Sequence, residues 1–328
     1  MAGVQEHVAI PADLEAQLEQ HRRALTGYCY RMLGSSFEAE DAVQEAMLRA
    51  WRNADRFEGR ATFKSWLYRI ATNVCLDMLD GRKRRARPMD LSGAGTPADA
   101  EITTLPENVW LEPIPDARVL PEAADPAELA QERETLRLAF VNALQHLPAR
   151  QRSVLILREV LRWSAAETAE LLDTSVASVN SALQRARAGL DATGVQLAET
   201  PADLDASQRA LLDRYVAAFE SYDMDALVAL LHEDAVMSMP PIALWLRGQE
   251  HIRTWFVTAG AGCEGSRLIK TMANGLPAYG QYRRIEGHYL PWGLGVLEIS
   301  DGRVTGINTF LDAERLFPLF GLPLTLDA

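Results

Sequence analysis

The spacing of hydrophobic positions changes along the chain. Apolar residues recur at a helical period of about 3.6 over residues 22–87 and 131–190, which contain few prolines or glycines. No such period runs through residues 88–130. In the last part of the chain, two helical stretches give way to segments in which apolar and polar residues alternate, such as residues 267–274 and 303–311. The pattern predicts a multidomain protein with two all-α regions, a connection between them and a C-terminal α+β domain.

The second helical region predicts a helix-turn-helix. Its apolar positions over residues 136–161 indicate two amphipathic helices broken at Pro148. Ser164 and Glu167 have the spacing of a capping box, which predicts the start of a short helix. After a tight turn, a second helix is expected over residues 176–190.

This second helix has an apolar side and a polar side. The residues expected on the buried side are Val176, Val179, Leu183 and Ala186. The residues expected to face outward are Ser178, Asn180, Ser181, Gln184, Arg185 and Arg187. Short polar groups suit base edges in a major groove and arginine suits guanine or phosphate, so the outward side is typical of a DNA-recognition helix. A plain helical hairpin with a polar face is the alternative that this pattern alone leaves open.

Length and composition limit the class of protein. A chain of 328 residues exceeds what one hydrophobic core usually serves, which favours two or three domains. It has no apolar run of the roughly 20 residues that cross a bilayer. Its first 21 residues carry four acids and no Lys or Arg, unlike a secretion signal. We therefore expect a cytoplasmic protein with no membrane partner.

Three cysteines lie far apart in the sequence. Cys29, Cys75 and Cys263 form no CxxC pair, which argues against a disulfide framework and against a metal site. We expect all three to be reduced and mostly buried thiols.

Charge is distributed unevenly within a formal total of −12. The helical regions are positive, at +6 over residues 22–87 and +2 over residues 131–190, whereas residues 88–130 and 191–328 each carry −8. Five basic residues gather between positions 82 and 87. Such a cluster suits either the negative pole of a helix or a polyanion, and the neighbouring motifs decide between the two. The domain boundaries predicted from these changes are 1–87, 88–130, 131–195 and 204–328.

The first helical region contains a helix with an unusual outer face, AEDAVQEAMLRAW at residues 39–51. The residues expected in its buried stripe are Val43, Met47 and either Ala50 or Trp51. The residues expected to face outward are Asp41, Gln44, Glu45, Leu48 and Arg52. Leu48 would then be an exposed apolar residue ringed by polar ones, as in a partner surface. A solvated helix face is the alternative.

The next segment, FEGRATFKSWLYRIATNVCLDMLDGRKRR at residues 57–85, combines aromatic and basic side chains. The alternating residues are Phe57, Phe63 and Trp66 with Arg56, Arg60 and Lys64. Aromatic walls with cations can trap bases that leave the DNA stack and hold their phosphates. Some of these aromatics must belong to the core, and we expect Trp66 to do so. One helical face is expected to run through Asn73, Asp77 and Arg84 into the basic cluster.

These motifs together resemble bacterial sigma factors of the extracytoplasmic-function (ECF) group, over about residues 18–87 and 131–190. The resemblance implies that the helix at 39–51 docks on the clamp of core RNA polymerase and that the helix-turn-helix reads the minus-35 promoter element. The implied partners are core polymerase, through its clamp and flap, and promoter DNA. The residues implied at the melted minus-10 element are Arg60, Lys64, Asn73, Asp77, Arg82, Lys83, Arg84 and Arg85.

Residues 88–130 have the composition of a linker, with seven prolines and nine acids against one arginine. In the sigma family the equivalent linker threads the polymerase cleft, where acidic side chains suit a channel shaped for a polyanion. Within it, VWLEPIPD at residues 109–116 is too apolar and too rigid for a plain spacer. We expect Trp110 and Leu111 to dock on a folded domain.

The C-terminal part resembles the SnoaL-like domains, a cone-shaped α+β fold, on the motifs at residues 211–241 and 244–256. This fold implies a pocket. The side chains expected to line it are Met237, Met239, Trp245, Trp255, Tyr289, Trp292, Asn308 and Phe310. Candidates for acid–base chemistry are His232, Asp234, His251 and His288. They form no recognisable motif, so we assign no catalytic residue, no metal and no cofactor. The pocket could instead bind a small-molecule ligand that the sequence does not identify.

The predicted function is that of a sigma factor that binds core RNA polymerase and directs promoter-specific transcription initiation. The acidic C-terminal domain is expected to pack on the cationic helical domains within the chain and to modulate them, by inhibition or by assistance. One alternative is a ligand-responsive helix-turn-helix regulator that acts without polymerase, which leaves the motif at 39–51 idle. Another is an enzyme with a DNA-binding appendage, which needs a catalytic constellation that the sequence does not reveal.

Overall fold

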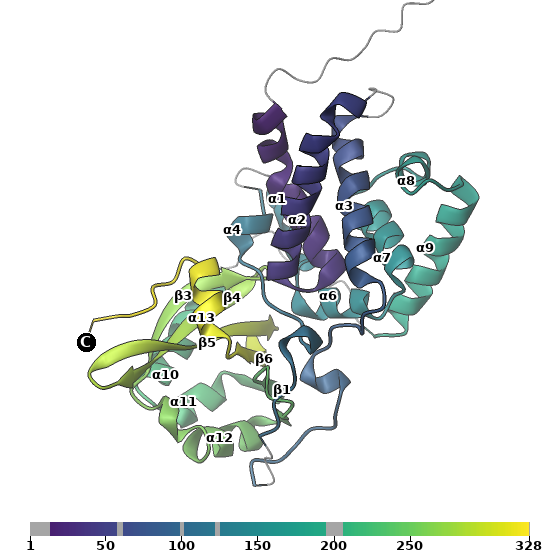
Figure 1. Cartoon of the computed structure of the whole chain (residues 1–328). Helices are drawn as coiled ribbons and strands as arrows, with labels where there is room; N and C mark the ends of the chain where they lie inside the picture. Colours follow the sequence, from purple (N-terminus) through teal and green to yellow (C-terminus); the bar gives the residue numbers. More distant parts are fainter. Residues whose placement is uncertain (1–13, 58–61, 99–101, 122–124, 195–205, 328) are drawn as a thin grey trace, which may run out of the picture. The chain divides into compact units, whose positions relative to one another are not determined.

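The computed structural model divides the chain into two compact units (Figure 1). It describes residues 14–57, 62–98, 102–121, 125–194 and 206–327. Unit 1 contains residues 1–84, 117–124 and 138–198, and unit 2 contains residues 85–116, 125–137 and 199–328. The expected combination of all-α parts with a C-terminal α+β part is confirmed. Most of the segment expected as a linker belongs to unit 2.

The described residues of unit 1 form helices joined by short non-helical connections. Its helices are α1 (Leu14–Leu33), α2 (Ser36–Arg52), α3 (Phe63–Leu79), α6 (Leu138–Gln145), α7 (Ala149–Leu155), α8 (Ala165–Leu171) and α9 (Val176–Asp191), with a 3-10 turn at Ala54–Arg56 and a π-helical turn at Ile156–Val160. Helices α1, α2 and α3 pack against one another side by side (Figure 1). The single turn α4 (Asp116–Val119) lies where the chain passes from unit 2 to unit 1.

Helix α3 is shorter than the sequence pattern predicted. It starts at a cap in which the Thr62 hydroxyl accepts the Ser65 N–H at 3.1 Å, and it ends at Leu79. Gly81 then adopts a left-handed φ of +68°, which a glycine accepts without steric cost and which stops the helix. The prediction that Arg84 lies on the same helical face as Asn73 is therefore wrong, because Arg84 follows the helix in an extended segment.

Buried polar contacts join the helices of unit 1. The hydroxyls of Tyr28 in α1 and Thr72 in α3 share a hydrogen bond of 2.8 Å. Arg152 in α7 donates to the Gln145 side-chain oxygen at 2.7 Å and to the Met32 carbonyl of α1. Burial lowers the pKa of Arg152 to about 10. Because a buried guanidinium needs several acceptors, this contact fixes α7 against α1.

All three cysteines are buried free thiols, as expected. Cys29 and Cys75 lie in the core of unit 1, where a hydrogen bond between them and burial together raise the pKa of Cys75. Cys263 lies in unit 2.

The helix-turn-helix is confirmed as α8, a turn and α9. The Ser164 hydroxyl accepts the Glu167 N–H at 3.1 Å, and the Glu167 carboxylate accepts the Ser164 N–H at 2.8 Å, which completes the expected capping box. Val179, Leu183 and Ala186 are buried. Val176 is 44% exposed, against the prediction, because it is the first residue of α9 and precedes the packed stretch of the helix.

Unit 2 is built on a six-stranded sheet with the order β2-β1-β6-β5-β4-β3. Its strands are β1 (Leu231–Ser238), β2 (Trp245–Arg247), β3 (Arg267–Ala273), β4 (Leu276–Ile285), β5 (His288–Ser300) and β6 (Arg303–Phe310). Its helices are α5 (Pro126–Glu134), α10 (Ala206–Glu220), α11 (Met224–Ala229), α12 (Gln249–Val257) and α13 (Ala313–Leu319), with 3-10 turns at Pro88–Asp90, Glu107–Val109 and Ala261–Cys263. Strands β1 and β6 are parallel, and the other neighbours are antiparallel.

Alternate residues of β4 face opposite sides of this sheet. Tyr279 packs against Tyr215 of α10, with ring centroids 5.5 Å apart. Tyr282 packs against Phe317 of α13 at 5.0 Å. Helices α10, α11 and α12 thus cover one face (Figure 1), and α13 lies on the other. A Cβ at Gly280 would lie 2.6 Å from Leu322, so glycine lets the segment after α13 approach the sheet.

Two connecting segments, residues 85–116 and 125–137, pack within unit 2. The Trp245 indole N–H donates to the Ser92 carbonyl at 2.9 Å, and the Leu105 N–H donates to the Pro241 carbonyl at 3.0 Å. Trp110 and Leu111 are buried here, as expected of a docked segment.

Both connecting segments meet at the turn between β3 and β4. The Ile114 N–H donates to the Asn274 side-chain oxygen at 3.0 Å, and the Asn274 side-chain N–H donates to the Leu136 carbonyl at 2.8 Å. The Gly275 N–H donates to the Asp116 carboxylate at 2.8 Å. The helix expected to run through Leu136 is broken at this residue, between α5 and α6, where its carbonyl bonds to Asn274.

Candidate functional site

Helix α2 carries an exposed surface with two large apolar side chains. Leu48 is 42% exposed and Trp51 is 56% exposed, while Ala50 completes the buried stripe. The sequence left Ala50 and Trp51 as alternatives for that stripe. The spacing of positions 48, 51 and 52 places them on one side of a helix and could have indicated Trp51 as part of the surface. We define the α2 surface as Asp41, Gln44, Glu45, Leu48, Trp51 and Arg52.

The polar side chains of the α2 surface differ in exposure and in hydrogen bonding. Asp41, Gln44 and Arg52 are exposed, as expected. Glu45 is partly buried and accepts a hydrogen bond of 2.7 Å from Arg49. Arg49 also donates to the Asp77 carboxylate of α3 at 3.4 Å, so Glu45 and Asp77 share one cation.

The aromatic residues at the start of α3 form one cluster. The ring of Phe57 lies 5.8 Å from that of Phe63 and 5.2 Å from that of Trp66, measured between centroids. Trp66 is half-buried in this cluster rather than in the closed core. Arg60 lies outside the described residues. Asn73 and Asp77, one turn apart on α3, are both exposed.

Lys64 and Tyr68 of α3 contact the segment that precedes α8. The ring centroid of Trp163 lies 5.2 Å from that of Tyr68, and the Lys64 ammonium lies 5.9 Å from the Trp163 ring. Tyr68 and Trp163 are both buried. The two regions expected to read different promoter elements therefore contact each other in unit 1.

The basic cluster divides into an exposed part and a buried part. Arg82, Lys83 and Arg84 are exposed in unit 1. Arg82 pairs with Glu38 at 2.5 Å, and Arg84 donates to the His146 ring at 2.6 Å.

The other part lies in unit 2, where Arg85 is buried and Arg87 is half-buried. Arg85 is 7% exposed, and its guanidinium donates to the Trp110 carbonyl at 2.5 Å. Arg87 pairs with Glu298 at 2.9 Å and donates to Asn308 at 3.0 Å. The prediction that Arg85 contacts DNA is thus corrected, because its guanidinium is committed to buried acceptors.

The polar side of α9 is exposed along its length. Its exposed residues are Ser178, Asn180, Ser181, Gln184, Arg185 and Arg187, all as expected. The Ser178 hydroxyl bonds to the capping Ser175 hydroxyl at 2.9 Å, and Arg187 pairs with Glu159 at 2.6 Å. Between these two bonded positions lie the exposed side chains of Asn180, Ser181, Gln184 and Arg185.

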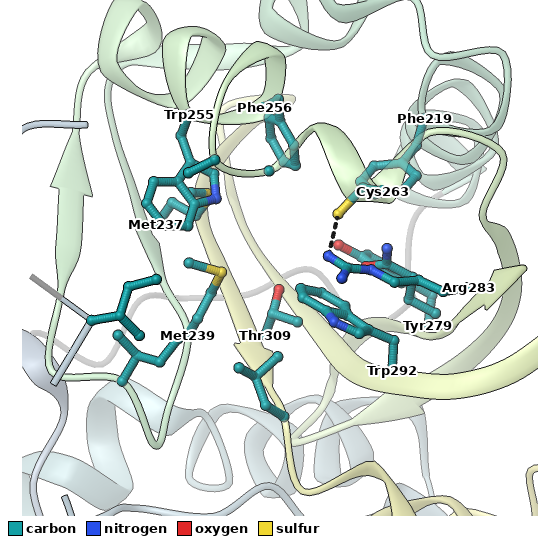
Figure 2. Close-up of a pocket in the computed structure, with 16 residues that line it drawn as sticks. Phe219, Met237, Met239, Trp255, Phe256, Cys263, Tyr279, Arg283, Trp292 and Thr309 are labelled. Carbon is teal, nitrogen blue, oxygen red and sulfur yellow. Dashed lines mark hydrogen bonds between the residues drawn. The ribbon is translucent and has the colours of Figure 1, made fainter. Parts of the chain in front are cut away.

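Unit 2 contains a cavity of about 250 Å³ (Figure 2). Its lining residues are Ile102, Phe219, Met237, Met239, Ile242, Trp255, Phe256, Ala259, Gly260, Cys263, Tyr279, Gln281, Arg283, Trp292, Thr309 and Leu311. Most of the wall is apolar or aromatic. Arg283 is the charged residue of the lining, and Figure 2 shows it between Trp292 and Cys263.

Half of the expected pocket residues line this cavity. Met237, Met239, Trp255 and Trp292 do so. The expectation for Asn308 and Phe310 is wrong, because on β6 and just after it Thr309 and Leu311 face the cavity, and successive strand residues point to opposite faces.

Trp245 and Tyr289 also lie outside the lining. The Trp245 indole bonds to Ser92 of a connecting segment, and Tyr289 lies under the Arg267 guanidinium at 4.5 Å. Both rings are therefore used to hold other parts of unit 2.

The candidates for acid–base chemistry lie away from the cavity. His232 is half-buried on β1, and Asp234, His251 and His288 are exposed. The His232 ring accepts the Asp234 N–H at 3.2 Å. Within the described ranges, His, Cys, Asp and Glu side chains gather nowhere in a group of three that could hold a metal ion. None of the described helices has the length and hydropathy of a membrane span.

Three family models match separate parts of the chain. Sigma-70 region 2 matches residues 18–85, Sigma-70 region 4 matches residues 137–190, and the SnoaL-like domain matches residues 212–307. The first two matches contain α2, α3 and all but the last residue of α9, and the third contains most of the sheet.

Curated relatives extend the likeness over nearly the whole chain. The chain is 45% identical over 317 residues to the ECF RNA polymerase sigma factor SigG of Mycobacterium tuberculosis, which covers 96% of this chain and 85% of the relative. It is 30% identical over 274 residues to the ECF sigma factor SigJ of the same species, at 80% of each chain. The crystal structure of SigJ is similar in fold, with a TM-score of 0.59 at 23% identity over 94% of this chain and 99% of that one.

Proposed function

The chain belongs to the extracytoplasmic-function group of RNA polymerase sigma factors, and we propose that three surfaces of unit 1 carry its promoter-specific work. The α2 surface docks on the clamp of core RNA polymerase. A second surface, on α3 and residues 82–84, contacts the minus-10 element. The third, on α9, contacts the minus-35 element. A sigma factor acts beside polymerase and chromosome, so the protein works in the cytoplasm.

One observation carries the polymerase contact: the exposure of Leu48 and Trp51 on a helix whose other side is buried. Large aromatic side chains ringed by polar ones are typical of the centre of a protein interface. Asp41 and Gln44 supply such a ring, since both are exposed on the same helix. The family resemblance supports a polymerase contact on this helix.

The two DNA surfaces combine side chains for bases with side chains for phosphates. The residues that we assign to the minus-10 element are Lys64, Asn73, Asp77, Arg82, Lys83 and Arg84, and Arg60 remains a prediction from the sequence. Those that we assign to the minus-35 element are Ser178, Asn180, Ser181, Gln184, Arg185 and Arg187. Amide side chains such as Gln184 can bond two edges of one adenine, and cations such as Lys83 release counterions from phosphates.

Promoter binding requires unit 1 to open. Tyr68 and Trp163 hold the two DNA-reading regions together, with ring centroids 5.2 Å apart. Two promoter elements about two helical turns apart are separated by roughly 70 Å on the DNA. The chain between the two DNA-reading regions runs through the connecting segments, most of which are packed in unit 2. Few of its residues are therefore free to extend over that distance. We therefore assign to unit 2 a restraining role that ends when these segments are released.

Run-off transcription tests the sigma function. The full chain is combined with core polymerase from the same bacterium on its sheared genomic DNA, and discrete promoter-dependent transcripts are expected. Leu48→Gln should weaken binding to core polymerase about thirtyfold, because placing a polar side chain at a central apolar interface position costs about 2 kcal/mol. Val257→Gln on α12 is the matched control, since Val257 is 45% exposed and lies in unit 2. Equal core affinity of both variants and the wild type would contradict the α2 assignment.

Release of the connecting segments tests the restraint. Asn274→Ala removes the side chain that bonds to both segments, at Ile114 and at Leu136. Transcript yield should rise, and a fall would give unit 2 an assisting role instead. The alternative of a regulator without polymerase is not favoured, because it leaves the α2 surface without a partner.

A further inference from the structure

The cavity in unit 2 has walls suited to a flat apolar body. Five aromatic side chains line it: Phe219, Trp255, Phe256, Tyr279 and Trp292. Figure 2 shows them around a common space, with Met237 and Met239 along one side. Its volume of about 250 Å³ is near the lower end of the range for small-molecule sites.

Most polar groups of the lining are bonded to one another or to neighbouring residues. The Tyr279 hydroxyl bonds to the Tyr215 hydroxyl at 3.0 Å. The Gln281 side-chain N–H donates to the Ser266 hydroxyl at 3.0 Å. These groups are therefore satisfied without a ligand, and they leave the wall largely neutral.

Arg283 differs from these groups. Its guanidinium carbon lies 3.9 Å from the centroid of the Trp292 ring, and one terminal N–H donates to the Cys263 sulfur at 3.2 Å. Its Nε is buried and has no hydrogen-bond partner. No carboxylate of the described residues pairs with it. A thiol is a weak acceptor, so this cation lines an aromatic chamber with one N–H on a weak acceptor and another without a partner.

We propose that this cavity binds a small aromatic carboxylate. The ring system lies between the aromatic walls, and the carboxylate bonds to the Arg283 guanidinium. A planar guanidinium matches a carboxylate with two parallel hydrogen bonds, and stacking on Trp292 holds it in one plane for that contact. Among the described residues that line the cavity there is no Asp, Glu or His, which fits a site that holds such a molecule.

The bound molecule would also contact a connecting segment. Ile102 lines the cavity beside Ile242. The residues that follow Ile102 are bonded to the same stretch of chain: the Ala243 N–H donates to the Thr103 carbonyl at 2.9 Å, and the Leu105 N–H donates to the Pro241 carbonyl at 3.0 Å. Occupancy thus favours the docked form of residues 102–105. This regulatory consequence rests on the restraining role proposed for unit 2.

The test uses 2-naphthoate and its neutral counterpart 2-naphthamide as probes, titrated into the full-length chain by calorimetry. Wild type should bind the acid about tenfold more tightly than the amide or better, because a charge-assisted bond replaces a neutral one. Arg283→Gln should remove this preference. Arg284→Gln should keep it, because the neighbouring residue on β4 is exposed and faces the other side of the sheet.

Three outcomes would overturn the proposal: no binding of the acid at millimolar concentration, equal affinity for acid and amide in the wild type, or a preference that survives Arg283→Gln. Hydrogen exchange adds a second readout. Naphthoate should slow exchange of the Leu105 and Ala243 amides at least threefold, and unchanged rates with bound probe would remove the link to the connecting segment. Polymerase is absent from both measurements, so their failure leaves the sigma function untouched.

Discussion

Units 1 and 2 use the same residue types in opposite ways. Trp51 and Lys83 of unit 1 are exposed on or after helices, whereas Trp110 and Arg85 of unit 2 are buried. Arg84 and Arg85 are adjacent in sequence, yet one is exposed and the other is bonded to buried carbonyls. In unit 1 these side chains are exposed, as the proposed contacts with polymerase and DNA require, whereas in unit 2 they hold the connecting segments.

The largest effect is expected from Trp110→Ala. Trp110 is 3% exposed, and its indole N–H donates to the Leu105 carbonyl at 3.3 Å. Truncation of a buried tryptophan costs about 3–5 kcal/mol, because it leaves a cavity and unpaired polar groups. The free energy of local opening, measured by hydrogen exchange at the Leu111 amide that bonds to Ala86, should fall by that amount.

Trp51→Ala is the matched substitution in unit 1. Because Trp51 is 56% exposed, the free energy of unfolding should change by less than about 0.5 kcal/mol. Core polymerase affinity, measured by co-elution at several concentrations, should fall about tenfold. A stability loss at Trp51 as large as that at Trp110 would remove the contrast between the two units.

Helix faces in unit 1 could be predicted from sequence because a helix places residues by a fixed local period. The buried Val179 and Leu183 and the exposed Asn180 and Gln184 follow from that period alone. The end of α3 was missed although Asp80 and Gly81 form a common helix stop. The basic residues that follow are themselves good helix formers, so composition alone favours a longer helix than the one observed.

The arrangement of unit 2 depends on pairings between distant residues, which local spacing does not encode. Arg87 meets Glu298, and Ile114 meets Asn274. The aromatic character of the cavity could be predicted. The predicted facing of β6 was off by one residue, so Thr309 rather than Asn308 lines the cavity. The sequence did not indicate Arg283 as a cavity residue. An arginine next to a second arginine in a strand carries no local signal of the side chains that it will contact.

A pH-dependent effect is expected at Asp116. Burial raises the pKa of this carboxyl to about 6, while the Gly275 N–H and Arg133 lower it by less. Since the folded pKa exceeds the ordinary value of 3.8, the protonated form stabilises the docked segment. This stability is complete below about pH 4 and is lost as pH rises through 6, by about 3 kcal/mol at most. Opening at the Asn274 amide, which bonds to Ile114, measures it.

Asp116→Asn separates the charge from the hydrogen bond. The amide oxygen can still accept the Gly275 N–H, so the variant should lose the stability change between pH 4 and pH 7 and should match the protonated wild type. Asp116→Ala removes the acceptor as well and should weaken docking at every pH. A pH profile that is unchanged in Asp116→Asn would assign the dependence to another group.

A smaller effect than at Asp116, about 2 kcal/mol, is expected from Arg85→Ala, and it distinguishes the two parts of the basic cluster. The guanidinium bonds to the Trp110 carbonyl and lies 3.9 Å from the Glu112 carboxylate, so its loss removes a donor from a buried carbonyl and a nearby cation from Glu112. Docking at the Leu111 amide should weaken by that amount. The salt dependence of promoter binding by the holoenzyme should keep its slope, because Arg85 faces no phosphate.

Lys83→Ala should leave the docking of the connecting segment unchanged and should alter the salt dependence of promoter binding. Lys83 is exposed, so the stability of both units should stay within about 0.5 kcal/mol of the wild type. The slope of log affinity against log salt should become shallower by about 1, since one phosphate contact releases about one counterion. If Arg85→Ala changed this slope and Lys83→Ala did not, the boundary between partner-binding and segment-holding cations would lie elsewhere in the cluster.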